Sequence, residues 1–174
     1  MSALEALEAK IALRKATELA ELLSVPVERA RTMTKAERRA RILELIRTEA
    51  GALAEYFRRA GYPEQFGGAK GRVLEVEVVV DTVQPAGFLR KERAVTNYEY
   101  QSRAAWYLDY IDGDHVWFLP ETLELATTYY RSSHRADVVL FEDLEGFKDL
   151  RKLFKALRRI GLNHIAEQSP SATT

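Results

Sequence analysis

The sequence predicts an α+β protein in which N-terminal helices pack on an antiparallel sheet of about four strands, followed by a C-terminal coiled-coil-like helix. Apolar residues recur at helical spacing over 3–60, alternate at strand spacing over 72–131, and return to helical spacing after that. Of the 174 residues, 47% are hydrophobic and 30% are charged, which allows a buried core and rules out a disordered chain. We expect an α+β domain over 1–136, a helix over 137–162 and a disordered tail over 169–174.

Two helices are expected near the N-terminus. Large apolar residues recur at spacings of three and four from Leu4 to Ile11, and a helix over 3–23 accommodates them on one stripe. Pro26 ends this helix, because the residue before a proline is pushed out of the helical region. A short second helix is expected over 26–31.

A longer third helix follows, running to about Ala60. Thr34 and Glu37 have the spacing of a capping box, in which each side chain bonds to the other residue's backbone amide. Gly61 suits the left-handed conformation that often ends a helix. The inner face of this helix is expected to carry Ile42, Ile46, Ala50, Leu53 and Phe57.

Strand periodicity begins near residue 73. Alternating apolar residues predict a first strand over 73–83 and a second over 89–101, with a bend near Ser102. A helix over 103–111 is the alternative for the segment after the bend. A further strand is expected over 122–131.

Asp112–Gly113 is typical of a two-residue hairpin turn, because both central residues of that turn need positive φ angles. A turn at this place pairs Tyr110 with His115, Leu108 with Trp117 and Trp106 with Leu119. In that register one face carries Trp106, Leu108, Tyr110, Trp117 and Leu119, and the other carries Tyr107, Asp109, Ile111, Val116 and Phe118.

The C-terminal helix carries a narrow apolar stripe, surrounded by basic residues, that resembles a coiled-coil seam. If it folded back on the sheet, it would cover the face that is proposed below for nucleic acid. We therefore expect a homodimer or tetramer formed through this helix. Its contacts would be Leu144, Phe147, Leu150, Phe154 and Leu157.

Catalytic signatures are missing. The chain has no cysteine, its three histidines are far apart, and no phosphate-binding loop is present. We expect no enzyme activity, no cofactor and no metal ion. Without an apolar run of about 18 residues or a signal-peptide pattern, the expected location is cytoplasmic, with no membrane partner.

Aromatic and basic residues on the strands indicate a surface for single-stranded DNA or RNA. Exposed rings can stack on unpaired bases while cations hold phosphates, with little sequence specificity. The expected stackers are Tyr107, Phe118 and Tyr130, with Tyr98, Tyr100 and Trp117 added if the sheet bends. The expected phosphate contacts are Arg90, Lys91, Arg93 and Arg103. The net charge is zero, which argues against binding by bulk charge alone.

Two other functions stay open. Glu75, Glu77 and Asp81 alternate along the first strand and could serve a metal-dependent nuclease, although no lysine follows at the spacing such enzymes use. The other possible function is that of a structural or regulatory module that binds other proteins.

The order of parts resembles the ThermoDBP-like single-stranded-nucleic-acid-binding proteins of thermophilic archaea. The matching features are the helices of 3–60, the strands of 72–131 with Tyr98, Tyr100 and residues 116–118, and the apolar seam of 140–160. The resemblance implies a basic-edged aromatic cleft, self-association through the last helix and a thermophilic source. A charge-rich, cysteine-free composition fits that source.

Overall fold

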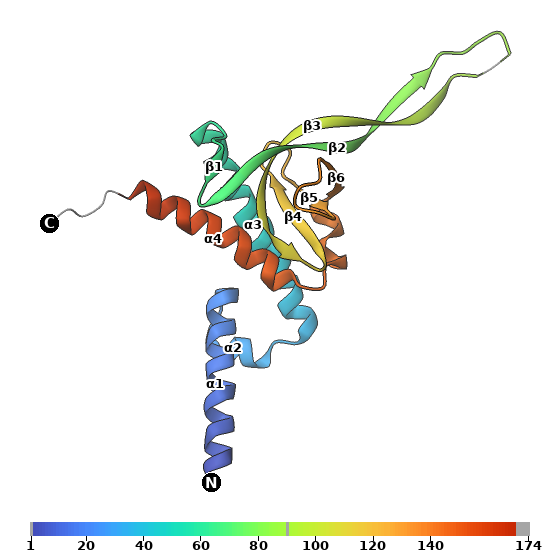
Figure 1. Cartoon of the computed structure of the whole chain (residues 1–174). Coiled ribbons are helices and arrows are strands. Elements are labelled where there is room, and N and C mark those ends of the chain that lie inside the picture. The colour runs from blue at the N-terminus through green and yellow to red at the C-terminus, as the bar shows by residue number, and fades with distance from the viewer. Residues whose placement is uncertain (1, 90, 170–174) are drawn as a thin grey trace. The chain divides into compact units, whose positions relative to one another are not determined.

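The computed structural model, which describes residues 2–89 and 91–169, confirms the α+β class (Figure 1). Two compact units are distinguished, Met1–Arg47 and Thr48–Thr174, and each is described by itself. The helices are α1 (Ala3–Leu23), α2 (Val27–Thr32), α3 (Lys35–Ala60), the 3-10 helix η1 (Phe141–Gly146) and α4 (Leu150–Gln168). The strands are β1 (Gln65–Phe66), β2 (Ala69–Gln84), β3 (Arg93–Ile111), β4 (Asp114–Leu119), β5 (Glu124–Thr128) and β6 (Arg135–Val139). Of the predicted tail, only Ser169 lies within the described residues.

The N-terminal helices have the predicted bounds to within one residue. The capping box before α3 is formed: the Glu37 amide donates to the Thr34 hydroxyl at 3.2 Å, and the Thr34 amide donates to the Glu37 carboxylate at 2.7 Å. Gly61 has a φ of +74°, as its place after α3 requires. The predicted inner face is buried throughout: Ile42, Ile46, Ala50, Leu53 and Phe57.

The sheet differs from the prediction, since it has six strands and mixed pairing. Neighbouring strands from β1 to β6 pair in an antiparallel manner, but β2 also pairs in parallel with β6 through Glu75 and Arg135. Strands β2 to β6 therefore close into a small barrel. β6 was missed because Val138 and Val139 run directly into the apolar pattern of the following helix.

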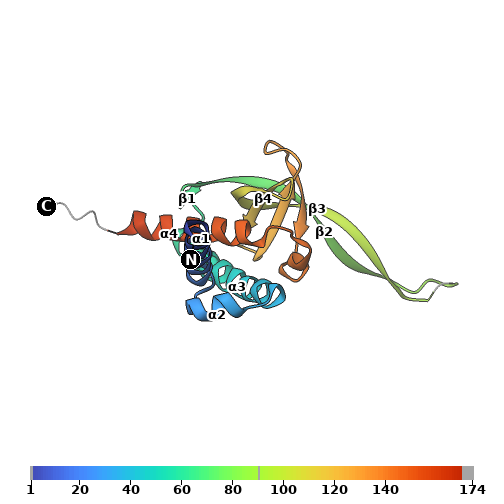
Figure 2. The same cartoon turned by 90° about the horizontal axis from the view of Figure 1, so that it is seen from below.

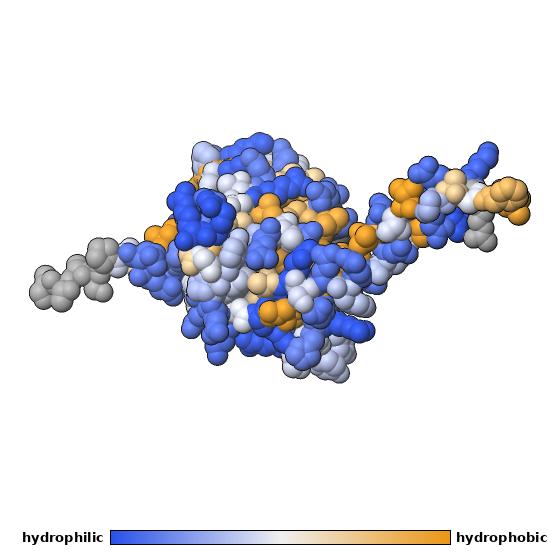
Figure 3. Space-filling view, turned by 90° about the horizontal axis from the view of Figure 1, so that it is seen from above, coloured by the Kyte–Doolittle hydropathy of each residue, from blue (hydrophilic) through white to orange (hydrophobic). Residues whose placement is uncertain are grey.

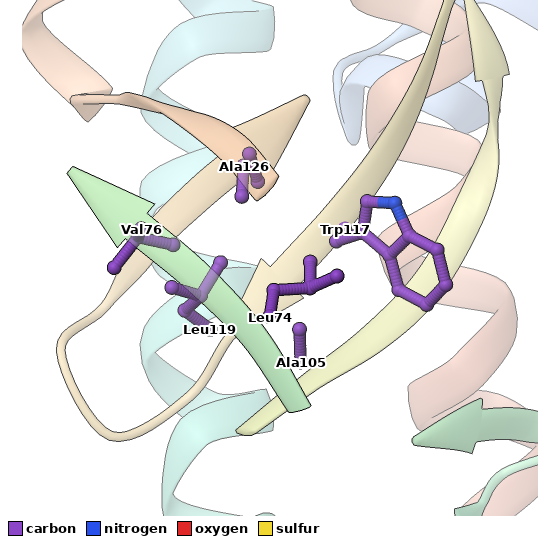
Figure 4. Packing of buried hydrophobic residues seen from close by; sticks show 7 residues of the cluster. Leu74, Val76, Ala105, Trp117, Leu119 and Ala126 are labelled. Atoms are coloured by element: carbon purple, nitrogen blue, oxygen red, sulfur yellow. The ribbon is translucent and has the colours of Figure 1, made fainter. Parts of the chain in front are cut away.

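The barrel interior holds the main hydrophobic cluster. Its buried members come from all five strands of the barrel and are Leu74, Val76, Ala105, Trp117, Leu119, Ala126 and Ala136. Figure 4 shows the Trp117 indole together with smaller side chains of the cluster. The indole nitrogen of Trp117 donates to the hydroxyl of Thr128 at 3.1 Å, so the buried polar atom is satisfied.

β3 is one continuous strand of 19 residues, so the predicted end of the strand at residue 101 and the alternative helix over 103–111 were both wrong. The turn at Asp112–Gly113 is confirmed, with φ angles of +54° and +88°, and so is the pairing of Tyr110 with His115. A bulge between Tyr107 and Asp109 then shifts the register by one residue.

The bulge changes which rings share a face. Beyond it, Trp106 pairs with Phe118 instead of the predicted Leu119, and Trp117 pairs with Tyr107 instead of the predicted Leu108. Trp106 and Phe118 consequently lie on the outer face of the barrel, where Phe57 of α3 contacts both rings at centroid distances of 4.6 and 6.0 Å. Tyr107 lies with Trp117 on the interior face.

The C-terminal helix packs on its own barrel. The predicted helix over 137–162 is replaced by the end of β6, by η1, and by α4, which starts at Leu150. The Arg159 guanidinium donates to the Leu108 carbonyl at 2.9 Å, and a Cβ on Gly67 would lie 2.2 Å from the Ile160 carbonyl oxygen. Four residues of the predicted self-association stripe are buried within the chain and the fifth, Phe147, is partly buried; the buried four are Leu144, Leu150, Phe154 and Leu157.

The predicted seam is therefore not open to a second chain, because the helix buries it against the barrel. Leu150, Phe154 and Leu157 of the helix are each no more than 3% exposed within the single chain. In the described part of the chain, none of the helices combines the length and apolar character that crossing a bilayer requires.

β2 and β3 continue past the barrel as a two-stranded ribbon, which we call the arm and define as residues 77–100 (Figures 1 and 2). Pairing of the two strands runs from Gly71 with Trp106 to Gln84 with Arg93. β6 pairs with β2 only at Glu75 and Val76, so the arm has no third strand among the described residues.

Candidate nucleic-acid interface

The structure does not assemble the predicted aromatic platform. Phe118 is fully buried and Trp117 is 3% exposed, so neither ring offers a face to a base. Their burial was missed because both faces of β4 are covered: Trp117 lies in the interior cluster of the barrel and Phe57 of α3 contacts Phe118. Of the six predicted stackers, Tyr98, Tyr100 and Tyr130 remain exposed.

Tyr98 and Tyr100 lie on the arm among carboxylates. Glu77 lies directly opposite Tyr100, and Asp81 follows on the same face of the ribbon. These carboxylates would repel phosphates brought near the two rings. The arm beyond Tyr100, with Tyr98, is therefore a poor site for a polyanion, contrary to the prediction.

The predicted cations are also dispersed. Arg90 lies outside the described residues. Arg93 donates to the Gln84 side chain at 3.2 Å near the outer end of the arm, about 45 Å along β3 from Tyr107 at 3.3 Å per residue. Lys91 is in the same outer segment, whereas Arg103 lies opposite Leu74 and is partly buried. The three predicted phosphate contacts that the structure describes thus form no common site with the predicted stackers.

A different set of residues meets at the barrel end that holds the loop between β5 and β6, residues 129–134. The Arg72 guanidinium of β2 donates to the Arg131 carbonyl at 2.8 Å and lies 2.9 Å from Nδ1 of His134. The Glu75 amide donates to the His134 carbonyl at 2.7 Å. The loop is therefore tied to β2, although it is about 60 residues away in the sequence.

Three arginines of the barrel strands and of the loop 129–134 lie on aromatic rings. The guanidinium carbon is 5.6 Å from the ring centroid for Arg72 on Trp117, 4.2 Å for Arg131 on Tyr107 and 4.5 Å for Arg135 on Tyr100. Within the described residues, none of the three has a carboxylate oxygen within 4.0 Å. We call this set the arginine–ring cluster: Arg72, Arg131 and Arg135 with Trp117, Tyr107 and Tyr100.

Tyr107, a predicted stacker, has a different role from the one expected. It is partly buried, its ring meets Trp117 edge to face at 5.1 Å, and its hydroxyl lies 3.0 Å from Nδ1 of His115. Burial raises the pKa of the phenol, and the nearby Arg131 charge opposes that rise. Because Arg131 lies over the ring, a base would meet the guanidinium plane before it met Tyr107.

Exposed tyrosines extend the cluster. Tyr129 and Tyr130 are 73% and 64% exposed, and their rings meet edge to face at 4.6 Å. Both are in the loop that Arg72 anchors. Sequence reasoning found Tyr130 but missed Tyr129, Arg72, Arg131 and Arg135. The signal that could have found two of them is the Tyr-Tyr-Arg run itself, at a turn between strands.

The acidic residues of the nuclease alternative do not converge. Glu75 accepts a hydrogen bond from the Ser102 hydroxyl at 2.6 Å, and Asp81 accepts one from Thr96 at 3.5 Å. In the described residues, no group of three or more histidine, aspartate or glutamate side chains is placed to hold a metal ion. The hairpin Asp112 is used structurally, since it accepts the amides of Lys148 and Asp149 just before α4.

Comparison with known proteins gives no family. No protein-family model matches the sequence, and neither curated proteins nor solved structures include a significant match. Function therefore has to be inferred from the geometry of the barrel end.

Proposed function

We propose that this protein binds single-stranded nucleic acid at the barrel end formed by β2 and the loop 129–134. The observation that carries the proposal is the arginine–ring cluster, in which three guanidinium groups rest on rings and lack a carboxylate partner among the described residues. Such groups keep their full positive charge for an incoming anion, although both terminal nitrogens of Arg72 are already bonded to the loop.

The rings fix the guanidinium groups before a ligand arrives. A cation–π contact contributes about 0.5–1 kcal/mol at an exposed site, enough to bias a long side chain toward one orientation. Arg72 is additionally held by the Arg131 carbonyl. Phosphates of a nucleic acid would then meet a partly ordered set of donors, which lowers the entropy cost of binding.

Single strands are favoured over duplexes by the exposed tyrosines. Tyr129 and Tyr130 present ring faces beside Arg131, and a stacked base contributes about 1–3 kcal/mol. Bases in a duplex are already stacked and paired, so they cannot use these rings. An acidic protein segment would use the arginines but not the ring faces.

Fluorescence anisotropy with a labelled oligothymidylate longer than about 16 nucleotides tests the proposal. Tyr130→Ala should weaken binding by about 1–3 kcal/mol, or roughly 5- to 150-fold. Arg131→Gln should also weaken it, while Arg14→Gln in α1 serves as the control and should not. A matched duplex should bind more weakly than the single strand.

Equal affinity for duplex and single strand would reject base stacking. Tight binding of an acidic peptide, with no measurable binding of the oligonucleotide, would assign the arginines to a protein partner instead. An unchanged affinity in both barrel variants would remove this end of the barrel from the site.

A further inference from the structure

The arm carries charge of opposite sign along its length. The inner part of the arm, residues 77–84 and 94–100, contains Glu77, Asp81 and Glu99 and no basic residue. The outer segment, residues 85–93, contains three basic residues and one acidic residue in the sequence, with Lys91 and Arg93 among the described ones. The inner part of the arm is therefore negatively charged, and the outer segment, which we call the tip, is positively charged.

The tip is also the most exposed apolar part of the described chain. Phe88 is fully exposed and Leu89 is 91% exposed, above every other large apolar residue that the structure describes. Hydrophobic side chains reach the outer end of the arm in Figure 3. Water-exposed phenylalanine and leucine in adjacent positions are costly for a soluble protein unless they meet a partner.

We propose that the tip of the arm docks on an anionic lipid surface, with Phe88 and Leu89 inserted at the boundary between headgroups and acyl chains. Lys91 and Arg93 would lie at the headgroups. Apolar side chains combined with nearby cations are what interfacial membrane binding uses, and each cation near an anionic bilayer strengthens binding roughly five-fold. This does not require a membrane-spanning segment, so the reason given for expecting no membrane partner does not apply to it.

The charge distribution favours a flat surface that touches only the tip. Asp81 is three residues farther from the tip than Gln84, about 10 Å at 3.3 Å per residue, and Glu99 is farther still. The screening length at physiological salt is about 8 Å, so these carboxylates are largely screened from a bilayer at the tip. A nucleic acid that lay along the arm would instead meet Glu77, Asp81 and Glu99 directly.

Co-sedimentation of the full chain with vesicles tests the proposal. Vesicles of phosphatidylcholine with about one third phosphatidylserine supply the anionic surface, and phosphatidylcholine alone is the comparison. The wild-type protein should sediment with the anionic vesicles and much less with the neutral ones. Phe88→Ser with Leu89→Ser should lower the partition coefficient by about tenfold or more. Lys91→Gln with Arg93→Gln should lower it by roughly 25-fold on anionic vesicles.

The matched control is Leu4→Ser with Leu7→Ser in α1, where the side chains are 65% and 55% exposed. It also removes two exposed apolar residues and should leave sedimentation unchanged. Loss of vesicle binding in this control would overturn the proposal. Unchanged vesicle binding in the variant Phe88→Ser with Leu89→Ser would overturn it too, as would a wild-type protein that does not sediment with anionic vesicles.

Oligothymidylate binding separates this inference from the proposed function. The variant Phe88→Ser with Leu89→Ser should bind the oligonucleotide as the wild type does, because the tip lies far along β3 from the arginine–ring cluster. If this variant loses oligonucleotide binding and the wild type shows no preference for anionic vesicles, the tip belongs to a nucleic-acid site and the lipid proposal is wrong. A failure of oligonucleotide binding in the wild type would leave the vesicle result unaffected.

Discussion

Arginines on the helices and arginines of the barrel have different partners. On the helices, Arg14 pairs with Glu18 at 3.0 Å, Arg29 pairs with Glu37 at 3.0 Å, and Arg58 pairs with Glu55 at 2.6 Å. At the barrel end, Arg72, Arg131 and Arg135 lie on rings, and no described carboxylate is within 4.0 Å. The two groups have the same side chain but opposite electrostatic surroundings.

This difference indicates which positive charges are available to a ligand. On the helix surface each carboxylate neutralises its arginine, and the hydrogen bond from Arg58 is the main reason that the pKa of Glu55 falls to about 2. Such exposed pairs add little to the stability of the fold, because both charges remain in water. A ring orients a guanidinium without cancelling its charge, so the barrel end keeps a positive field that a phosphate can meet.

The largest expected effect separates buried rings from exposed ones. Phe118→Ala removes a fully buried ring from the layer beneath Phe57 and should lower the free energy of unfolding by about 3–5 kcal/mol. Tyr130→Ala removes a 64% exposed ring and should change it by no more than about 0.5 kcal/mol. Urea denaturation followed by circular dichroism measures both. Similar losses in the two variants would mean that the loop ring is part of the core.

A smaller effect is expected at the ring beneath Arg131. Tyr107→Phe removes the contact between the hydroxyl and Nδ1 of His115, which should lower the free energy of unfolding by about 0.5–1.5 kcal/mol. In the wild type, burial raises the pKa of Tyr107 above its ordinary value of 10.0. The folded protein therefore retains a proton that the unfolded chain loses, so this contribution is complete below pH 10 and falls as the pH rises through the folded pKa.

Denaturation at a series of alkaline pH values, with absorbance of the phenolate recorded in parallel, checks this sign. Charged groups near the phenol are Arg131, which opposes the rise in pKa, and Asp109, which adds to it; His115 contacts the hydroxyl. Tyr107→Phe should remove the late-titrating phenol. A phenol at this position that titrates below pH 10 would show that Arg131 outweighs burial.

The smallest effect is expected on the helices. Arg14→Gln breaks an ion pair whose side chains are 82% and 63% exposed, and it should change the free energy of unfolding by no more than about 0.5 kcal/mol. Thermal and urea denaturation measure it. A loss of several kcal/mol would show that the helical pairs are structural in a way that their exposure does not explain.

Local signals in the sequence were sufficient for the N-terminal helices and for one hairpin turn, but not for the C-terminal helix. The Thr34–Glu37 capping box, the stripe from Ile42 to Phe57 and the turn at Asp112–Gly113 all depend on residues within a few positions of one another. Short-range chemistry of this kind is present in the sequence whatever the rest of the chain does.

The candidate site was not predictable in the same way. The bulge near Leu108 has no local signature, yet it reverses the faces of the β3 residues beyond it, Tyr107 and Trp106 among them, relative to their β4 partners. The closure of the barrel depends on the parallel pairing of Glu75 with Arg135, 60 positions apart. Arg72 and Arg131 meet only because of that closure, so no sequence window contains the cluster.

The salt dependence of oligothymidylate binding tests the central claim most directly. For single strands, the logarithm of affinity falls with the logarithm of salt concentration by about 0.7 for each phosphate neutralised. Replacing Arg131 and Arg135 together by glutamine should make the slope less steep by about 1.4, measured between about 50 and 200 mM salt. Replacing the helical Arg14 and Arg29 should leave the slope unchanged. The same slope in the wild type and the barrel variant would show that the arginines on the rings do not contact phosphates, and would contradict the account.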